Sequence, residues 1–221
     1  MIYAYAICEP DAAEPPPRRR GLGGAALRTL EQAGLVAVYS RHRSLRPRPS
    51  REAILVHERV VEEVMARGAV LPLRFGTQLE DEDRLAAALS DRHEGLQRVL
   101  DRVRGRVELG LRVLPVRPDA GAAAAPQGSG REYLLERVSR HRRAERAARE
   151  LNTPLAALAS ASRVKAAPAP PAILVAAYLL DPGDAPEFRA RAHELAARHD
   201  DLQAVVTGPW PPYSFVAEDD T

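Results

Sequence analysis

Three times in the first half of the sequence, an amphipathic stretch runs into a glycine and then into a short apolar run. The pairs Ala33-Gly34, Arg67-Gly68 and Arg104-Gly105 precede "LVAVY", "AVLPLRF" and "RVELGLRV". A glycine just past a helix can adopt the left-handed conformation that closes it, and an arginine in the last turn suits the negative end of the helix dipole. Each occurrence therefore predicts a helix, a stop and a strand.

The opening strand, residues 1–8, is apolar on both faces, which is typical of a strand in the middle of a covered sheet. Helices are expected at about 22–33 and 51–67, and strands at 35–39 and 69–75. The four acids of "EDED" at 80–83 suit the start of a helical pair, through capping and the positive end of the dipole. With the 51–67 helix as an insertion, this order predicts the β-α-β-β-α-β ferredoxin-like plan of an α+β domain.

The stretch "PDAGAAAAPQGSG" at 118–130 has no periodicity and is built from Ala, Gly, Pro and Ser, so it predicts a flexible linker. We therefore expect an α+β domain at 1–117 and a helix-rich α/β domain at 131–221. The second domain would hold a long helix from about 131 to 151 and a βαβ-like unit, with strands at 172–180 and 202–207 around a helix at about 185–199.

Cysteine content and hydropathy limit the setting in which the chain works. Cys8 is the only cysteine, so the chain can form no disulfide within itself and a reducing cytoplasm is expected. The opening "MIYAYAICEP" lacks the features of a signal peptide. The longest apolar run, "AILVAAYLL" at 172–180, is far shorter than the roughly 20 residues that cross a bilayer. We expect no membrane-spanning segment.

No motif of the sequence predicts catalysis, a cofactor or a metal. His57-Glu58 and His193-Glu194 resemble part of a zinc-protease helix, but that helix needs histidines at i and i+4, and position 61 is Val. Hydrogen-bonded or solvated histidines are the expected alternative. The glycines of "GLGGAAL" at 21–27 match neither phosphate-binding motif, and Cys8 lies in an apolar strand without a neighbouring base. We expect a protein that is not an enzyme.

Arginine-rich stretches keep nucleic-acid binding open as an alternative. "RHRSLRPRPSR" at 41–51 and the 131–150 helix could form a basic face on a ferredoxin-like sheet. The helix alternates its arginines with glutamates at favourable i, i+4 spacing, as solvated helices do. The strands also lack the ring side chains on which bases stack. An RNA-binding module and a small-molecule enzyme on the same fold therefore remain the two competing functions.

Two further stretches carry a resemblance. "HERVVEEVMARGAVLPLRFGTQLEDED" at 57–83 and "VVTGPWPPYSFV" at 205–216 closely resemble the signature segments of the GvpL/GvpF family of gas vesicle proteins. The Tyr-rich opening strand and the "GREYLLER" helix start match in the same order. The resemblance implies a non-enzymatic accessory protein of gas vesicles. It implies binding to the shell protein GvpA, with other accessory proteins as further partners, and support for vesicle nucleation and assembly, for example by preventing aggregation of GvpA.

The terminal motif "GPWPPYSF" predicts a bend at a sheet edge, because Pro209, Pro211 and Pro212 cannot donate to a strand ladder. We expect a rigid bend with Trp210 buried and an extended piece at 213–216, in preference to an exposed polyproline ligand. Candidates for contact with a partner or between domains are Arg74, Phe75, Trp210, Tyr213 and Phe215. Leu71, Leu73 and Phe75 are expected on the core side of a strand and Arg74 on its opposite face.

Overall fold

The chain forms two compact units that do not follow the sequence in two simple halves. The computed structural model describes residues 1–13, 20–44, 48–116, 146, 148–165 and 172–216. Unit 1 combines residues 1–107 with 210–221, and unit 2 comprises residues 108–209. The first boundary thus lies ten residues before the expected one, and the terminal motif belongs to unit 1. The linker expected at 118–130, and most of the helix expected at 131–151, fall outside the described residues.

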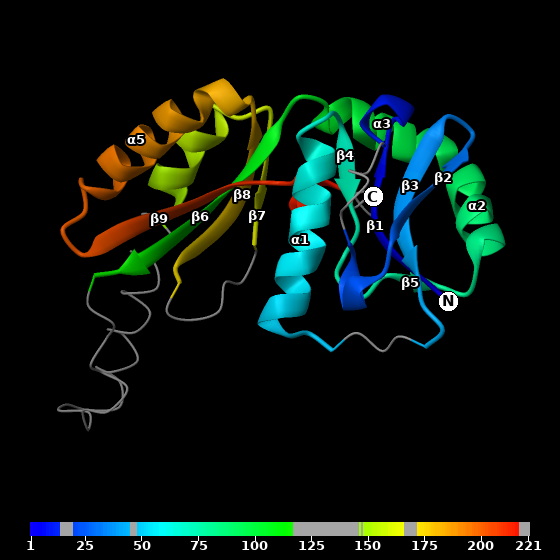
Figure 1. Cartoon of the computed structure of the whole chain (residues 1–221). Helices are drawn as coiled ribbons and strands as arrows, with labels where there is room; N and C mark the ends of the chain where they lie inside the picture. Colours follow the sequence, from blue (N-terminus) through cyan, green and yellow to red (C-terminus); the bar gives the residue numbers. More distant parts are fainter. Residues whose placement is uncertain (14–19, 45–47, 117–145, 147, 166–171, 217–221) are drawn as a thin grey trace, which may run out of the picture. The chain divides into compact units, whose positions relative to one another are not determined.

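Unit 1 is built on an antiparallel sheet with β1 in its interior (Figure 1). The sheet order is β2-β3-β1-β4, and a short β5 also pairs with β1. The prediction that the opening strand lies in mid-sheet is confirmed. The strands are β1 (Ile2–Cys8), β2 (Leu27–Gln32), β3 (Leu35–Arg41), β4 (Val70–Pro72) and β5 (Gln78–Leu79).

A β-bulge in β1 decides which of its side chains share a face. Ala4 pairs with Tyr39 and Ala6 with Val38, so that Tyr5 is an extra residue on β1. Tyr3 and Tyr5 precede the bulge and Ala6 and Cys8 follow it, yet all four belong to one buried cluster. Strict alternation along a strand would place Ala6 on the face opposite the tyrosines, and the bulge brings it to the same face.

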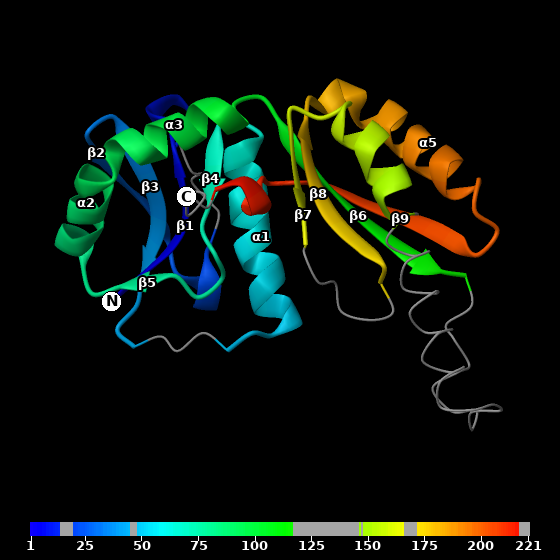
Figure 2. The same cartoon turned by 180° about the vertical axis from the view of Figure 1, so that it is seen from behind.

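Three helices cover the two faces of this sheet, α1 (Arg51–Met65) on one side and α2 (Glu82–Asp91) with α3 (His93–Val103) on the other (Figures 1 and 2). The Asp81 side chain accepts from the backbone N–H of Arg84 at 2.9 Å, which confirms the expected capping role of the acidic run. Gly105 follows α3 with φ +68°, as expected for a left-handed stop.

The segment at 22–33 is not the helix that its apolar spacing predicted. It contains a short 3-10 turn (Leu22–Gly24) and the strand β2, which forms a hairpin with β3 through Ala33 and Gly34, both at positive φ. Two residues with positive φ are what a tight hairpin turn requires, and pairing with β3 overrides the helical pattern. Unit 1 therefore begins β-β-β-α-β instead of following the ferredoxin-like order, whereas its α+β class is as predicted.

Unit 2 is a second sheet packed against helices. The strand order is β7-β8-β6-β9, with β9 at an edge as the prolines of the terminal motif predicted. Its strands are β6 (Val107–Pro115), β7 (Ala161–Val164), β8 (Leu174–Leu180) and β9 (Leu202–Trp210), and its helices are α5 (Ala185–Ala196) and a helical stretch over 148–156. The short β7 was not predicted. β8, β9 and α5 lie where the sequence placed them, whereas β6 was expected as the last strand of the first domain and instead joins this sheet.

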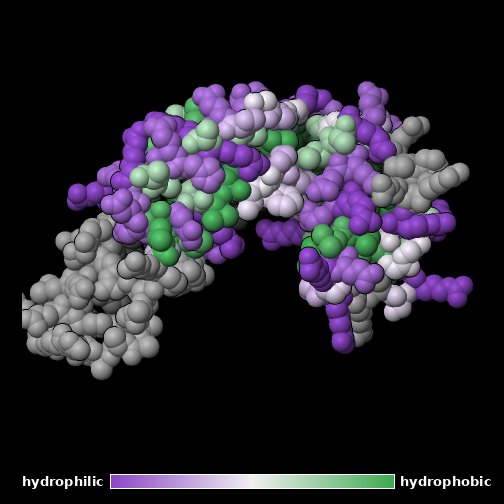
Figure 3. Space-filling model, turned by 60° about the vertical axis from the view of Figure 1, so that its left-hand side comes forward, coloured by the Kyte–Doolittle hydropathy of each residue, from purple (hydrophilic) through white to green (hydrophobic). Residues whose placement is uncertain are grey.

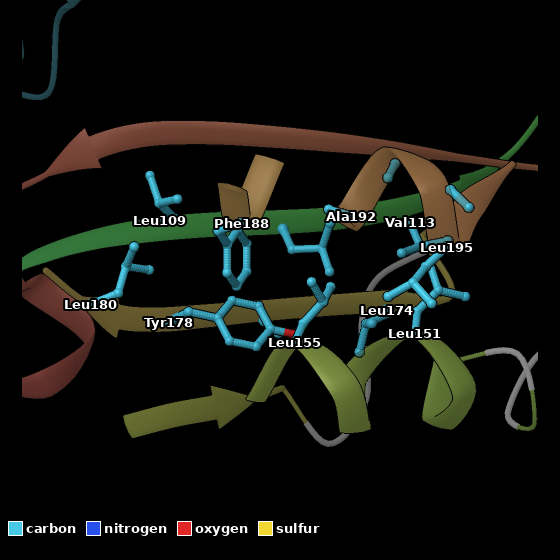
Figure 4. Close-up of a cluster of buried hydrophobic side chains, with 14 of the residues drawn as sticks. Leu109, Val113, Leu151, Leu155, Leu174, Tyr178, Leu180, Phe188, Ala192 and Leu195 are labelled. Carbon is cyan, nitrogen blue, oxygen red and sulfur yellow. The ribbon is translucent and has the colours of Figure 1, made fainter. Parts of the chain in front are cut away.

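Apolar side chains from both layers fill the core of unit 2. Leu109 and Val113 of β6, Leu155 of the helical stretch and Phe188 of α5 point into one cluster (Figure 4). The rings of Tyr178 and Phe188 lie 4.8 Å apart. In the part of the chain that the structure describes, no helix is both long enough and apolar enough to cross a membrane.

Candidate functional site

A chain of hydrogen bonds runs through the interior of unit 1 and joins β1, α1 and the loop after β4. The Nε2 atom of His57 lies 2.9 Å from the carbonyl oxygen of Leu73, which can only accept, so Nε2 carries the proton. In the neutral ring Nδ1 then accepts from the Tyr3 hydroxyl at 2.9 Å, and that hydroxyl accepts from the N–H of Gly76 at 3.0 Å. His57 is fully buried, and its neutral tautomer with the proton on Nε2 satisfies both ring nitrogens, the Leu73 carbonyl and the Tyr3 hydroxyl.

Burial reinforces this protonation state. It lowers the pKa of His57 below its ordinary value of 6.5, although the hydrogen bond to Leu73 acts in the opposite direction. Burial raises the pKa of Tyr3 to about 12, so the phenol keeps its proton. The pair is therefore held as neutral imidazole and neutral phenol over the physiological range, which makes it a structural link.

A second hydrogen-bonded chain begins at Tyr5. The N–H of Leu22 donates to the Tyr5 hydroxyl at 2.8 Å, the hydroxyl lies 2.8 Å from the Ser40 Oγ, and that oxygen lies 2.8 Å from Nε2 of His42. Burial, and then the charge of the chain's N-terminus, lower the pKa of His42. This series of hydrogen bonds connects the 3-10 turn at 22–24 to the sheet.

The aromatic rings around these hydrogen bonds form one cluster, to which Phe75 belongs. The Phe75 ring lies edge-on to Tyr3 at 6.0 Å and to His57 at 5.8 Å, and the Tyr3 and Tyr5 rings are 4.9 Å apart. Phe75 is half-buried and so lies at the boundary between this cluster and solvent. The prediction that it faces the core is confirmed.

Arg74 and Phe75 lie in a turn, because the strand expected at 69–75 ends at Pro72. The backbone N–H and the hydroxyl of Thr77 both donate to the carbonyl of Arg74, at 3.1 and 2.7 Å, and Gly76 has φ +94°. Leu71 is buried, Leu73 is half-buried and Arg74 is exposed. The leucines therefore face the core and Arg74 faces away from it, as the sequence predicted. The turn therefore presents a cation beside an anchored ring.

The terminal motif differs from its prediction at two places. Trp210 is 43% exposed, so its predicted burial is wrong, and residues 213–215 form a 3-10 turn instead of an extended piece. Trp210 is the last residue of an edge strand, and Pro211 and Pro212 take the buried positions after it. Phe215 is 1% exposed and anchors the segment. The bend is present, with its tryptophan outward.

Tyr213 brings this motif to α1. Burial, followed by the charge of Glu58, raises the pKa of Tyr213. Burial likewise raises the pKa of Glu58, which the Tyr213 hydroxyl partly offsets. The hydroxyl oxygen is buried and lies beside this carboxylate, although no partner among the described residues meets it in ideal hydrogen-bond geometry. Glu58 follows His57 directly, so Phe75 and Tyr213 both approach the same turn of α1, whereas Arg74 and Trp210 remain at the surface.

The sequence missed the residues that connect this cluster. Tyr3 and His57 are 54 positions apart, and only the hydrogen-bonded alternative for His57 anticipated its role. Among the described residues, no group of three His, Cys, Asp or Glu side chains could hold a metal ion. Cys8 is buried, which raises the pKa of its thiol to about 12. The arrangement supports packing and contact, and hydrogen bonds hold Tyr3 and His57 in place.

Comparison with known proteins decides the family. A model of the family described as "Gas vesicle synthesis protein GvpL/GvpF" matches residues 1–217. The chain belongs to this family. The resemblance of the two signature segments at 57–83 and 205–216 is thereby confirmed, and both segments contribute to the aromatic cluster or to its α1 border in unit 1.

Curated relatives and solved structures agree with this assignment. The chain is 31% identical to gas vesicle protein L of Streptomyces sp. (strain CB03234), covering 100% of this chain and 95% of the relative. Gas vesicle protein F2 of Halobacterium salinarum is 28% identical over 89% of this chain and 83% of its own length. A crystal structure of GvpF from Anabaena sp. PCC7120 matches with TM-score 0.81 at 20% identity, covering 98% and 96% of the two chains. That structure shows the same fold.

Proposed function

We propose that this member of the GvpL/GvpF family is an accessory protein that binds the gas vesicle shell protein GvpA and supports vesicle nucleation and assembly. Membership in a family of gas vesicle proteins gives the setting. A subunit destined for a water-excluding shell carries apolar surface, which a partner in the cytoplasm would cover until assembly. The chain would work by contact, without catalysis, cofactor or nucleic acid.

The exposure of Trp210 is the observation that carries the proposal. A large apolar ring is 43% exposed at the start of a segment whose Phe215 is buried. Tryptophan on a rigid support is the side chain that most often dominates a protein interface. Hydrophobic side chains also gather in more than one place among charged ones on the face drawn in Figure 3. We assign contact to Trp210 and Arg74, and support of those contacts to Phe75, Tyr213 and Phe215.

A co-expression pull-down tests this function. The chain is expected to retain GvpA through a wash in moderate and then high salt, because screening weakens charge pairs more than buried apolar area. Trp210→Ala should reduce retention, whereas Leu158→Ala, which removes an apolar side chain that is 39% exposed in unit 2, should not. If both variants retained as much GvpA as the wild type, Trp210 would not be part of the contact. Recovery of nucleic acid in place of GvpA would favour RNA binding.

A further inference from the structure

One face of α1 exposes apolar side chains at its first turn. Ile54 and Leu55 are 39% and 51% exposed, whereas His57, Val60, Val61 and Val64 bury the opposite face of the helix. Residues three and four apart on a helix are neighbours, so Ile54 and Leu55 lie one turn before Glu58 on the same side. Exposed branched side chains so close to the aromatic cluster offer an apolar contact surface to a partner.

Two like charges continue this face. Glu58 and Glu62 are spaced i, i+4, and the charge of Glu62 adds to the burial that raises the pKa of Glu58. Within the described ranges neither glutamate forms an ion pair, although Arg51 and Arg59 lie on the same helix. Burial therefore disfavours the charged form of the half-buried Glu58, and no cation among the described residues compensates for it.

The Tyr213 side chain forms the border of this face. Its buried hydroxyl oxygen lies beside Glu58, and the charge of that carboxylate adds to the burial that raises the pKa of the phenol. An incoming cation at Glu58 would also lower the cost of holding that carboxylate beside the phenol. A face with apolar residues at one end and two glutamates at the other is complementary to a segment that is apolar and basic.

We propose that the α1 face formed by Ile54, Leu55, Glu58, Glu62 and Tyr213 binds an amphipathic helix that carries one arginine or lysine within its apolar side. The apolar residues of that helix would cover Ile54 and Leu55, while its cation would reach both glutamates with a long, flexible stem. This is helix-in-groove recognition with one charged anchor. The inference rests on the proposed function, since the helix would belong to a gas vesicle protein.

Two synthetic helices test the face without the natural partner. Each has about five turns, a leucine-rich apolar side and a single central residue in that side, arginine in one peptide and glutamate in its twin. The full chain should bind the arginine peptide about tenfold more tightly, the effect of one partly desolvated charge pair. Glu62→Arg should reverse the preference, and the exposed Glu31→Arg of β2, with the same change in net charge, should preserve it.

The outcomes separate this proposal from the proposed function. Equal binding of the two peptides, or an equal response to Glu62→Arg and Glu31→Arg, would overturn the proposed face. Circular dichroism of both variants guards against loss of folding. Reversal by Glu62→Arg alone supports the face even if GvpA is absent from the pull-down, in which case only the named partner fails. Leu55→Ser should weaken both peptides alike, since it removes apolar contact and no charge.

Discussion

The two units fill their interiors in different ways. In unit 1, Tyr3, Tyr5, Ser40 and His57 place hydroxyls and an imidazole in the core, where each is hydrogen-bonded to another segment. In unit 2 the buried cluster consists of aliphatic and aromatic side chains, and Tyr178 reaches the Asn152 side chain at 2.6 Å. A hydrogen-bonded core specifies partners atom by atom, whereas an apolar core depends on volume and shape. The units should therefore respond differently to mutation and to pH.

The largest expected effect is a cavity in unit 2. Phe188→Ala removes a ring that is 1% exposed and should lower the free energy of unfolding of this unit by about 3–5 kcal/mol. Urea unfolding followed by circular dichroism measures the loss. Trp210, the only tryptophan, is the last residue of β9 and the first residue of the C-terminal part of unit 1, so its fluorescence serves as a second probe. Val205→Ala, at a position 40% exposed, is the control and should change little. A loss below about 1 kcal/mol for Phe188→Ala would contradict an apolar core that depends on shape.

Removing the imidazole tests the hydrogen-bonded core of unit 1. His57→Leu leaves the Tyr3 hydroxyl and the Leu73 carbonyl without this partner, and each buried unsatisfied group costs about 1–3 kcal/mol. We expect the Trp210 fluorescence transition to move to lower urea. His193→Leu on α5, where the histidine is exposed, should stay within about 0.5 kcal/mol. Equal stability of the two variants would mean that the imidazole contributes only its volume.

A smaller effect is expected where glycine meets a core hydroxyl. A Cβ at position 21 would lie 2.1 Å from the Tyr5 hydroxyl oxygen, so Gly21→Ala must displace the ring and break its bonds to Leu22 and Ser40. Overpacking of this kind costs about 1–3 kcal/mol. Gly183→Ala has nothing within 4 Å of the new Cβ and serves as the matched control. Thermal unfolding of both variants should separate them, and equal melting temperatures would disprove the tight fit.

The smallest effect is a difference in acid sensitivity. The pKa of His57 is near 6.5 when unfolded and lower when folded, so the unfolded chain binds the proton first. The stability of unit 1 should fall as pH drops below 6.5 and level off below the folded pKa. Comparing wild type with His57→Leu between pH 7.5 and 5 by urea unfolding isolates this contribution, because His42 and Glu58 are common to both. Parallel curves for the two proteins would contradict it.

The sequence predicted elements well where one local pattern sufficed. The strand at 1–8, the α1 helix, the acidic cap of α2 and the order β8-α5-β9 followed from apolar spacing, capping residues and glycine stops. Sequence-based prediction failed where contact with a residue far along the chain determines the local structure. The 22–33 segment has helical spacing but pairs with β3, the bulge at Tyr5 depends on the register with β3, and β7 is only four residues long.

The candidate site was predicted in part for the same reason. The terminal motif and the "LPLRF" stretch identified Phe75, Tyr213 and Phe215 as residues at or near buried positions. Trp210 was expected inside because aromatic residues and prolines surround it, and the end of an edge strand left it outside. The link through His57 depends on contacts between positions 3, 57 and 73, which no local spacing could reveal.

Unit 2 begins and ends within the chain of unit 1, since residues 108–209 lie between residues 107 and 210. During synthesis, Tyr213 and Phe215 therefore emerge only after all of unit 2 has been made. Until then α1 lacks the side chain that borders Glu58, and the Phe215 site is empty. Unit 1 can therefore be completed only in a chain in which unit 2 has already been synthesised.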